Sequence, residues 1–381
     1  MNLLSGIQQD FHRPQQSPGA YEWWHFDGTD DKSGYSFSIQ FFAGNLFSAF
    51  YQDSLKTYWQ KTKSPLVDPS RQPVPPNPLD YCGVALRVFH KGLMVGKALQ
   101  EFPAKFLKAS DKHGAVLLGP NRFNWDERGA PPSYVLTAQA PLREGKKLLR
   151  TRLFFTPLIN EFPNLPQPEI HSTHTWVLAA PLCHVEGTLE WCNAEGDVEK
   201  EQAFMGKGYH DHHFGSVPLD RFVKTWHWGR AFIGSETIVY SFQAPIDSQE
   251  PNEGLLFTAK GDEIRIWKVA FELSKNRRNF FWLPYQKNLE FTDADSLRIS
   301  HRQILSDGPA SLIFEDEIQW TKNGETLRGL GMSNYIYTPR LSSRFFFPML
   351  KGKTSVFIQK EDGPPPKTSD SGDVTTTRPA V

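Results

Sequence analysis

The sequence predicts an all-β protein of two domains, and three observations support this prediction. The 381 residues include 29 Phe, 11 Tyr and 11 Trp, an aromatic content that favours strands over helices. Short strand-like runs recur roughly every 8–12 residues, the spacing of barrels and sandwiches, with 28 Gly and 29 Pro available for the turns. No stretch keeps the i, i+3, i+4 apolar pattern of a long helix.

The chain is long enough for two domains that each bury a core, and its composition suggests where they meet. Residues 1–17 are polar and rich in Gln and Pro, and we expect an extended lead-in. Residues 193–206 are charged and contain glycine, so a joint there would divide a first domain, 18–195, from a second, 196–358. Residues 359–381 are rich in Pro, Ser, Thr and Asp, which is typical of a disordered tail.

Strand patterns fill both domains. Residues 22–27 read as a strand and residues 28–34 as a turn, while residues 35–41 alternate aromatic or apolar with small polar side chains. The proline-rich segments 61–80 and 156–168 are expected to be loops. Further strands of the first domain are expected at 83–90, 97–107, 115–118, 122–125, 134–138, 148–155, 171–178 and 185–191. Strands of the second are expected at 208–214, 222–232, 237–243, 255–259, 263–271, 288–292, 296–304, 310–320 and 335–337.

Charge and motifs exclude several classes of function. Basic and acidic residues balance at 42 each, which argues against a nucleic-acid surface. The chain contains no glycine-rich nucleotide-binding motif, no GxSxG elbow and no HExxH zinc motif. Cys82, Cys183 and Cys192 lack zinc-ligand spacing, and their odd number favours a reducing compartment. The N-terminus lacks the regions of a signal peptide, and no apolar run reaches about 18 residues. We therefore expect a soluble, cytoplasmic protein.

Three segments are dense in His, Trp, Tyr and Asp, and these carry the functional signal. Alternation along a strand places His174 and Trp176 on one face. In the second segment it places Tyr209, Asp211 and His213 on one face, with His210 and His212 on the other. In the third it places Trp226 and Trp228 on one face. If these faces meet at one cavity, they bring an acid, a phenol, imidazoles and indoles together.

Purely structural interpretations of the same residues stay open. Tyr209 and Asp211 could form a structural turn pair, and the tryptophans, Trp23 and Trp24 included, could be core. A metal site is the functional alternative for the histidines of residues 210–213, since His and Asp are good metal ligands. Because only two of these histidines share a strand face, we assign no metal site.

The motifs resemble those of the carotenoid 1,2-hydratases (hydroxyneurosporene synthases), which belong with the AttH-type, lipocalin-like two-barrel proteins. The resemblance covers about residues 18–345. Residues 20–27, AYEWWHFD, are similar to AYEWWYFD of the family, with His25 in place of a tyrosine. Residues 77–82, NPLDYC, resemble NPLDHC. The segments HTW, GYHDHHFG and WHWGRA match HxW, GYHDHNxG and WxWxRA, with His213 in place of an asparagine.

The resemblance implies a fold of two consecutive lipocalin-like β-barrels and a hydratase that acts on an apolar isoprenoid or carotenoid. It carries the catalytic positions over to His174, Trp176, Tyr209 and Asp211. The substrate-binding residues are expected to be Trp23, Trp24, His25, His213, Trp226 and Trp228. No metal or organic cofactor is implied, and peripheral contact with a membrane would allow substrate uptake.

Hydration of an alkene requires a strong acid, because carbon is a poor base. We expect burial among aromatic side chains to raise the pKa of Asp211 and keep it protonated. Asp211 would protonate C2 of the terminal unit, aromatic faces would stabilise the tertiary cation at C1, and His174 would deprotonate the attacking water. A cyclase or isomerase of a polyene and a non-catalytic lipid or pigment carrier are the alternatives, since fold alone does not fix the chemistry.

Overall fold

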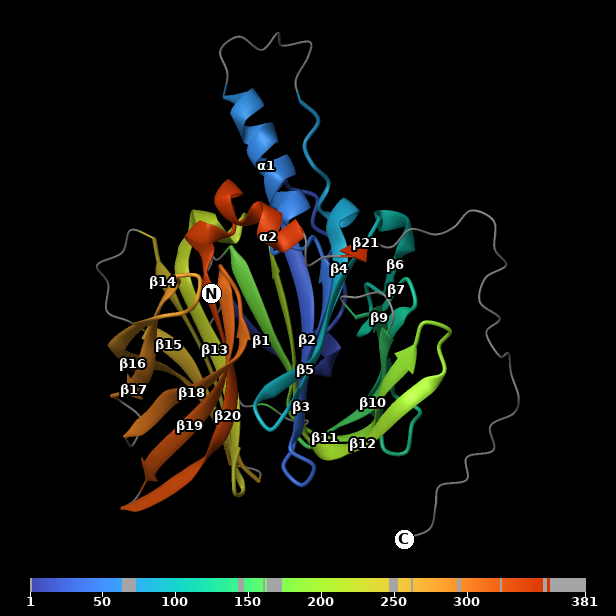
Figure 1. Ribbon diagram of the computed structural model, residues 1–381. Coiled ribbons are helices and arrows are strands. Elements are labelled where there is room, and N and C mark those ends of the chain that lie inside the picture. Colours follow the sequence, from blue (N-terminus) through green and yellow to red (C-terminus); the bar gives the residue numbers. More distant parts are fainter. Residues whose placement is uncertain are drawn as a thin grey trace.

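The computed structural model describes residues 2–63, 73–142, 147–159, 162, 173–246, 253–261, 263–292, 296–322, 324–351 and 355–356. Two β-sheets stand side by side, with two helices at one end of the molecule (Figure 1). Strands β1 to β12, with β21 from the C-terminal part of the chain, form a 13-stranded sheet, and strands β13 to β20 form a closed barrel. This arrangement confirms the all-β prediction.

The first sheet has the strand order β21-β5-β4-β3-β2-β12-β11-β10-β9-β8-β7-β6, and β1 pairs with β11. Its neighbours are antiparallel except for β1 with β11 and β21 with β5. The strand bounds are β1 (Asn2–Ser5), β2 (Tyr21–Asp30), β3 (Tyr35–Ala43), β4 (Cys82–His90), β5 (Leu93–Phe102), β6 (Leu107–Ala109), β7 (Ala115–Leu118), β8 (Asn121–Asp126), β9 (Ser133–Pro141), β10 (Lys147–Pro157), β11 (His174–Asn193), β12 (Val198–Gly215) and β21 (Ser355–Val356).

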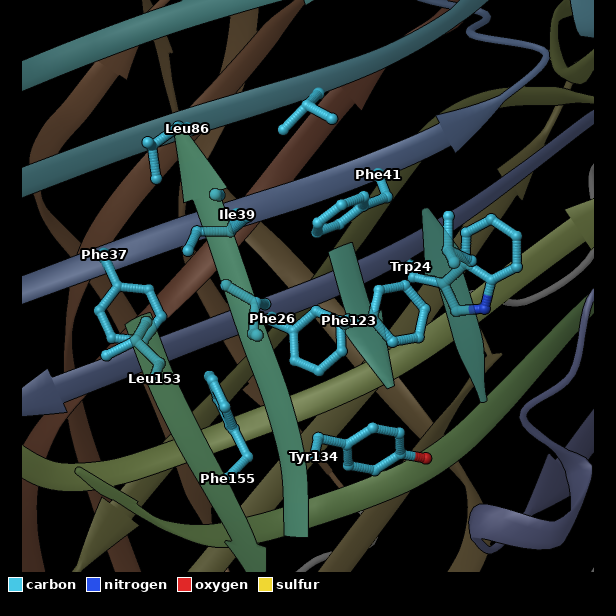
Figure 2. Close-up of a cluster of buried hydrophobic side chains, with 14 of the residues drawn as sticks. Trp24, Phe26, Phe37, Ile39, Phe41, Leu86, Phe123, Tyr134, Leu153 and Phe155 are labelled. Carbon is cyan, nitrogen blue, oxygen red and sulfur yellow. The ribbon is translucent and has the colours of Figure 1, made fainter. Parts of the chain in front are cut away.

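The first sheet curves around its own hydrophobic core. Figure 2 shows aromatic rings from β2, β3, β8 and β10 gathered on its concave side, with Trp24, Phe26, Phe123 and Phe155 among them. The rings of Phe26 and Phe123 have their centroids 5.0 Å apart. Because side chains alternate along β2, Trp24 and Phe26 fill this core while Trp23 points to the opposite face, which packs against the barrel.

The barrel is an antiparallel meander in which β13 also pairs with β20 and closes the ring. Its strands are β13 (Val223–Ile233), β14 (Glu236–Pro245), β15 (Glu253–Lys260), β16 (Glu263–Arg278), β17 (Pro284–Phe291), β18 (Leu297–Asp307), β19 (Ser311–Lys322) and β20 (Glu325–Tyr337). Its interior has a second core that includes Tyr240, Phe242 and Phe271.

The change from sheet to barrel falls between β12 and β13, near the short 3₁₀ helix η5 (Leu219–Arg221). The segment expected as the domain joint, 193–206, instead forms the β11–β12 turn and the first half of β12. The side chains of Val198, Glu199, Lys200 and Glu201 are exposed there, so the charges mark the solvent-facing part of a long hairpin. The expected strands 171–178 and 185–191 belong to one strand, β11, as far as they are described.

The strand and loop patterns did not predict a helix of 14 residues, α1 (Ala49–Thr62). Ser48 caps its N-terminus by accepting a hydrogen bond from the backbone N–H of Tyr51 at 3.2 Å. Only Ala49, Tyr51, Gln52 and Leu55 are buried, and this stripe is too short and too polar to give a clear helical period. The short helix α2 (Phe347–Lys351) lies beside α1 at the same end (Figure 1).

Several expectations concern residues outside those described. They include the tail 359–381 and most of the loop 156–168. Among the helices that are described, none combines the length and apolar character needed to cross a membrane.

Candidate active site

The motif residues meet where the convex face of the first sheet packs on the barrel. His213 of β12 is paired with Trp23 of β2 and with Trp176 of β11. Trp226 of β13, on the barrel, completes the contact with its ring 4.9 Å from that of His213. The alternation argument therefore correctly grouped the HxW, YxD and WxW residues, and their side chains are all buried.

Asp211 lies at the centre of this region. Its Oδ2 accepts hydrogen bonds from the hydroxyl of Tyr209 at 2.6 Å and from the indole Nε1 of Trp176 at 3.1 Å. The Nε2 atom of His213 lies 2.9 Å from the same oxygen. The other oxygen, Oδ1, is buried and has no hydrogen-bond partner among the described residues. Buried carboxylate oxygens usually accept hydrogen bonds, so Oδ1 can accept one from a further donor.

A chain of hydrogen bonds leads away from this carboxylate. The Nδ1 of His213 lies 3.3 Å from the Nε2 of His174, and the Nδ1 of His174 lies 2.7 Å from the hydroxyl of Tyr21. A neutral His213 that donates from Nε2 to Asp211 accepts at Nδ1. His174 then donates from Nε2 and accepts from Tyr21, so all the donors point toward Asp211. We call Tyr21, His174, His213 and Asp211 the relay.

The protonation of the relay differs from the sequence expectation. Burial alone would raise the pKa of Asp211, but the neighbouring His213 and His25 imidazoles and the Tyr209 hydroxyl outweigh burial and lower it. Burial lowers the pKa of His213, and it holds the pKa of His174 well below the usual range. The expectation of a raised pKa for Asp211 was therefore wrong, because it considered burial without the imidazole two residues away.

Indoles form a wall next to the relay. The ring centroids of Trp226 and Trp228 are 4.7 Å apart, and Trp226 is 5.6 Å from Trp23. Trp226 also meets the edge of His174 at 4.7 Å. This wall offers aromatic faces to any guest that reaches the carboxylate.

A buried ion pair joins sheet and barrel beside the relay. The Nε of Arg230, on β13, donates to Oδ1 of Asp27 on β2 at 2.6 Å, and its Nη2 donates to Thr29 at 2.8 Å. The Nε2 of His25 lies 3.1 Å from Oδ2 of Asp27. The carboxylate and the guanidinium are each almost fully buried. The arginine of the WxWxRA segment thus positions β13 against the motif strand β2.

A pocket opens beside the indole wall, between β3–β5 and the barrel. It encloses about 110 Å³ and is lined by Trp228, Phe42, Phe47, Ala310 and Leu341, among others. The ring of Trp228, which lines the pocket, has its centroid 6.3 Å from that of His213 in the relay. Because ligand pockets usually measure about 300–1,000 Å³, this one has room only for the end of a long chain.

Trp24 is not brought to this site. It lies on the core face of β2, where its ring stacks on His212 with centroids 4.7 Å apart. On that face His210 and His212 bind two buried carboxylates. Asp10 lies 2.8 Å from Nε2 of His210 and 3.2 Å from Nδ1 of His212, and Glu22 lies 2.9 Å from Nε2 of His212.

Two residues make contacts that the sequence patterns did not predict: Tyr21 bonds to His174, and Asp10 bonds to His210. Tyr21 shares a strand face with Trp23 and His25, so alternation could have included it. Asp10 lies in the segment that was expected to be an extended lead-in, and no pattern connects it with His210. Among the described residues, no group of three or more His, Cys, Asp or Glu side chains is arranged to hold a metal ion.

The chain resembles known proteins over most of its length. The model of a family described as carotenoid hydratase CrtC matches residues 40–350. A "hydroxyneurosporene dehydrogenase" of Chlorobaculum tepidum is 27% identical over 354 residues, which cover 90% of this chain and 89% of the relative. An "acyclic carotenoid 1,2-hydratase" of Thiocapsa roseopersicina is 25% identical over 252 residues, 65% of this chain and 53% of the relative.

Solved structures support the fold. A crystal structure described as an AttH protein from Nitrosomonas europaea has a TM-score of 0.54 at 14% identity, and the match covers 87% of this chain and 95% of that one. CghA in complex with Sch210972 has a TM-score of 0.51 at 14% identity, with 88% and 97% covered. At this identity, the likeness concerns the fold alone.

Proposed function

Because the chain belongs to the carotenoid hydratase family, we propose that it adds water across the terminal C1=C2 bond of an acyclic carotenoid and needs no cofactor for this step. The observation that carries the proposal is Asp211. It is fully buried, it holds one oxygen without a partner, and it ends a relay beside an indole wall.

The acid in this proposal is the Asp211–His213 pair rather than Asp211 alone. With one added proton, the pair is either an imidazolium and a carboxylate or a neutral imidazole and a carboxylic acid. An apolar substrate end that excludes water favours the neutral form, because burial disfavours charge. The partnerless Oδ1 of Asp211 then carries the proton toward the alkene.

The chemical step uses this proton. The O–H bond of Asp211 breaks as a C–H bond forms at C2, which leaves a tertiary cation at C1. Each indole face stabilises a desolvated cation by about 0.5–2 kcal/mol, and the candidates are Trp176, which donates to Asp211, and Trp226, 4.9 Å from His213. Water bonds to C1, and its surplus proton returns to the pair. His174 and Tyr21 act as positioning residues, since they fix which nitrogen of His213 bears hydrogen.

The pocket suits an apolar chain end. Phe42, Phe47 and Trp228 give its lining an apolar part, beside polar residues such as Asn45 and Arg87. The cyclase or isomerase and the carrier remain the competing functions, and the name of one relative raises dehydrogenation.

Incubation of the purified protein with lycopene or neurosporene in deuterated water separates these functions. Hydration gives a tertiary alcohol that is heavier by one water and carries deuterium on carbon, as seen by mass spectrometry. Isomers without deuterium on carbon would indicate a pericyclic reaction, a product lighter by a hydrogen pair would indicate dehydrogenation, and an unchanged bound polyene would indicate a carrier.

The Asp211→Asn variant should lose turnover by about 10²–10⁴-fold, the usual contribution of a general acid, while it still binds the polyene. Asp316→Asn is the matched control, because Asp316 is also buried and hydrogen-bonded to a histidine, His301, at 2.6 Å, but inside the barrel. Turnover is measured by product chromatography and binding by the absorption of the bound polyene. A rate near that of the wild type in Asp211→Asn would refute the acid assignment.

A further inference from the structure

Large aromatic side chains stand exposed at the end of the molecule where β16 turns into β17. Phe280 is 82% exposed and Trp282 is 69% exposed. Phe345, just before α2, is 80% exposed, and Met349, within α2, is 37% exposed. Scattered apolar residues on a surface are ordinary, but a cluster that exposes whole aromatic rings marks an interaction surface.

A single arginine connects the two aromatic segments. Arg340 donates to the backbone carbonyl oxygens of Phe281 and Trp282 at 2.8 and 2.9 Å. Its guanidinium also lies 4.9 Å from the ring centroid of Phe346. We call Phe280, Trp282, Phe345 and Met349 the aromatic rim.

Basic side chains accompany the aromatic rim. Arg277 and Arg278 are exposed, and neither forms an ion pair with a described residue. The guanidinium of Arg278 lies 5.4 Å from the ring of Trp282. Arg344 lies next to Phe345 and pairs with Asp53 of α1 at 3.3 Å, with both side chains partly exposed. Exposed Trp and Phe beside Arg is the composition of surfaces that bind the headgroup region of anionic bilayers.

Neighbours of the aromatic rim are hydrogen-bonded to residues that line the pocket. Asn279 donates from Nδ2 to Oδ1 of Asp307 at 2.6 Å and to the carbonyl oxygen of Gly308 at 2.8 Å. Arg340 donates to the carbonyl oxygen of Pro309 at 3.1 Å. Asp307, Gly308 and Pro309 all line the pocket, as Trp228 does.

We propose that the aromatic rim inserts into the headgroup region of an anionic lipid bilayer and holds the mouth of the pocket against it. An apolar polyene dissolved in the bilayer then enters the pocket without crossing water. Its reacting end reaches Trp228, while the rest of the chain, too long for about 110 Å³, stays among the lipids. The entry of a polyene rests on the proposed function, whereas the docking to lipid does not.

Flotation of the full chain with vesicles tests the docking without any substrate. The wild type should bind vesicles of phosphatidylcholine mixed with phosphatidylglycerol, and salt should weaken the binding. The triple variant Phe280→Ser, Trp282→Ser, Phe345→Ser should bind about a hundredfold more weakly, because apolar contact with the bilayer is lost. The matched control changes Leu93, Met205 and Leu330 to Ser, three exposed apolar residues on other strands, and should bind like the wild type.

Two activity assays separate this proposal from the proposed function. With carotenoid embedded in vesicles, the triple variant should lose most of its rate, whereas with carotenoid dispersed in detergent it should keep the rate of the wild type. A wild type that binds vesicles yet forms no product in either assay would refute the hydratase and leave the docking intact. A wild type that converts dispersed carotenoid but does not bind vesicles would overturn the docking, and so would dimerisation through the aromatic rim without vesicle binding.

Discussion

At the scale of single residues, this chain has His213 where the motif that it resembles has an asparagine. This difference changes how the protonation of Asp211 is controlled. In the family motif that this chain resembles, the position holds an amide, which cannot take up a proton. Here the imidazole lies 2.9 Å from Asp211 and lowers the pKa of its carboxyl. The chain therefore couples the acid to a titrating neighbour.

This coupling predicts a pH dependence. If the pair must hold one proton, kcat/KM should rise as pH falls below the ordinary histidine pKa of about 6.5, because burial lowers the pKa of His213. His213→Asn removes one of the two groups that share the proton and an influence that lowers the pKa of Asp211, so the pH at which kcat/KM rises should shift. The pH profiles of kcat/KM for both proteins check this, and superimposable profiles would contradict the role of the pair.

At the scale of elements, the first residues of the chain are tied to the core of the sheet by charge. Asp10 lies between His210 and His212, and Tyr134 donates to it at 2.8 Å. Both nitrogens of His212 face carboxylates, which raise its pKa despite burial. Burial alone would raise the pKa values of Asp10 and Glu22, but the histidines lower them.

The signs of these shifts give a stability prediction. Asp10 and Glu22 stabilise the fold above their unfolded pKa values of about 4, and this contribution is lost as pH falls through the lower folded values. His212 stabilises the fold below about 6.5 and loses its contribution as pH rises through its raised pKa. Asp10→Asn leaves a buried imidazolium with fewer partners, so the free energy of unfolding should drop by about 3–5 kcal/mol.

Urea unfolding at a series of pH values measures this drop. Asp126→Asn, which alters a half-buried turn carboxylate that caps the N–H of Arg128, is the control and should lose much less. A loss in Asp10→Asn no larger than in the control would show that the network does not hold the N-terminal segment.

The strand patterns predicted most of this site, and the failures have physical causes. Alternation placed His174 with Trp176 and Tyr209 with Asp211, because regular strands have a fixed period. Alternation also places Trp23 and Trp24 on opposite faces of β2. Both were nevertheless expected to bind substrate, and only Trp23 lies at the site. Contacts such as Tyr21 with His174 join strands that are distant in the chain, and local pattern holds no information about them.

At the scale of the whole molecule, the buried pair of Arg230 and Asp27 joins sheet and barrel beside their apolar contact. Arg230→Leu leaves the carboxylate of Asp27 buried without its cation, so it should lower the free energy of unfolding by about 3–5 kcal/mol. Arg298→Leu is the matched control, since Arg298 pairs with Glu290 at 3.3 Å on the surface, where a pair contributes about 0–1 kcal/mol.

Calorimetry checks this prediction through the melting temperature and the number of transitions. The wild type should unfold in a single transition, whereas Arg230→Leu should melt earlier and can separate the sheet from the barrel. Replacing both partners, as in Asp27→Leu with Arg230→Leu, should recover part of the loss, because no charge is then left buried. Equal losses in Arg230→Leu and Arg298→Leu would argue against the pair as the main link.

The strand order of the first sheet also decides when the relay can form during synthesis. Strand β2 pairs with β3 on one side and with β12 on the other. Almost two hundred residues must therefore be added after Tyr21 before Gly215, its partner on β12, is synthesised. Pairing across such separations closes long loops and is slow, and unpaired strand edges attract other chains meanwhile. The nascent chain therefore exposes one edge of β2, which contains two tryptophans, through about half of translation, and this is the stage at which a chaperone would protect it.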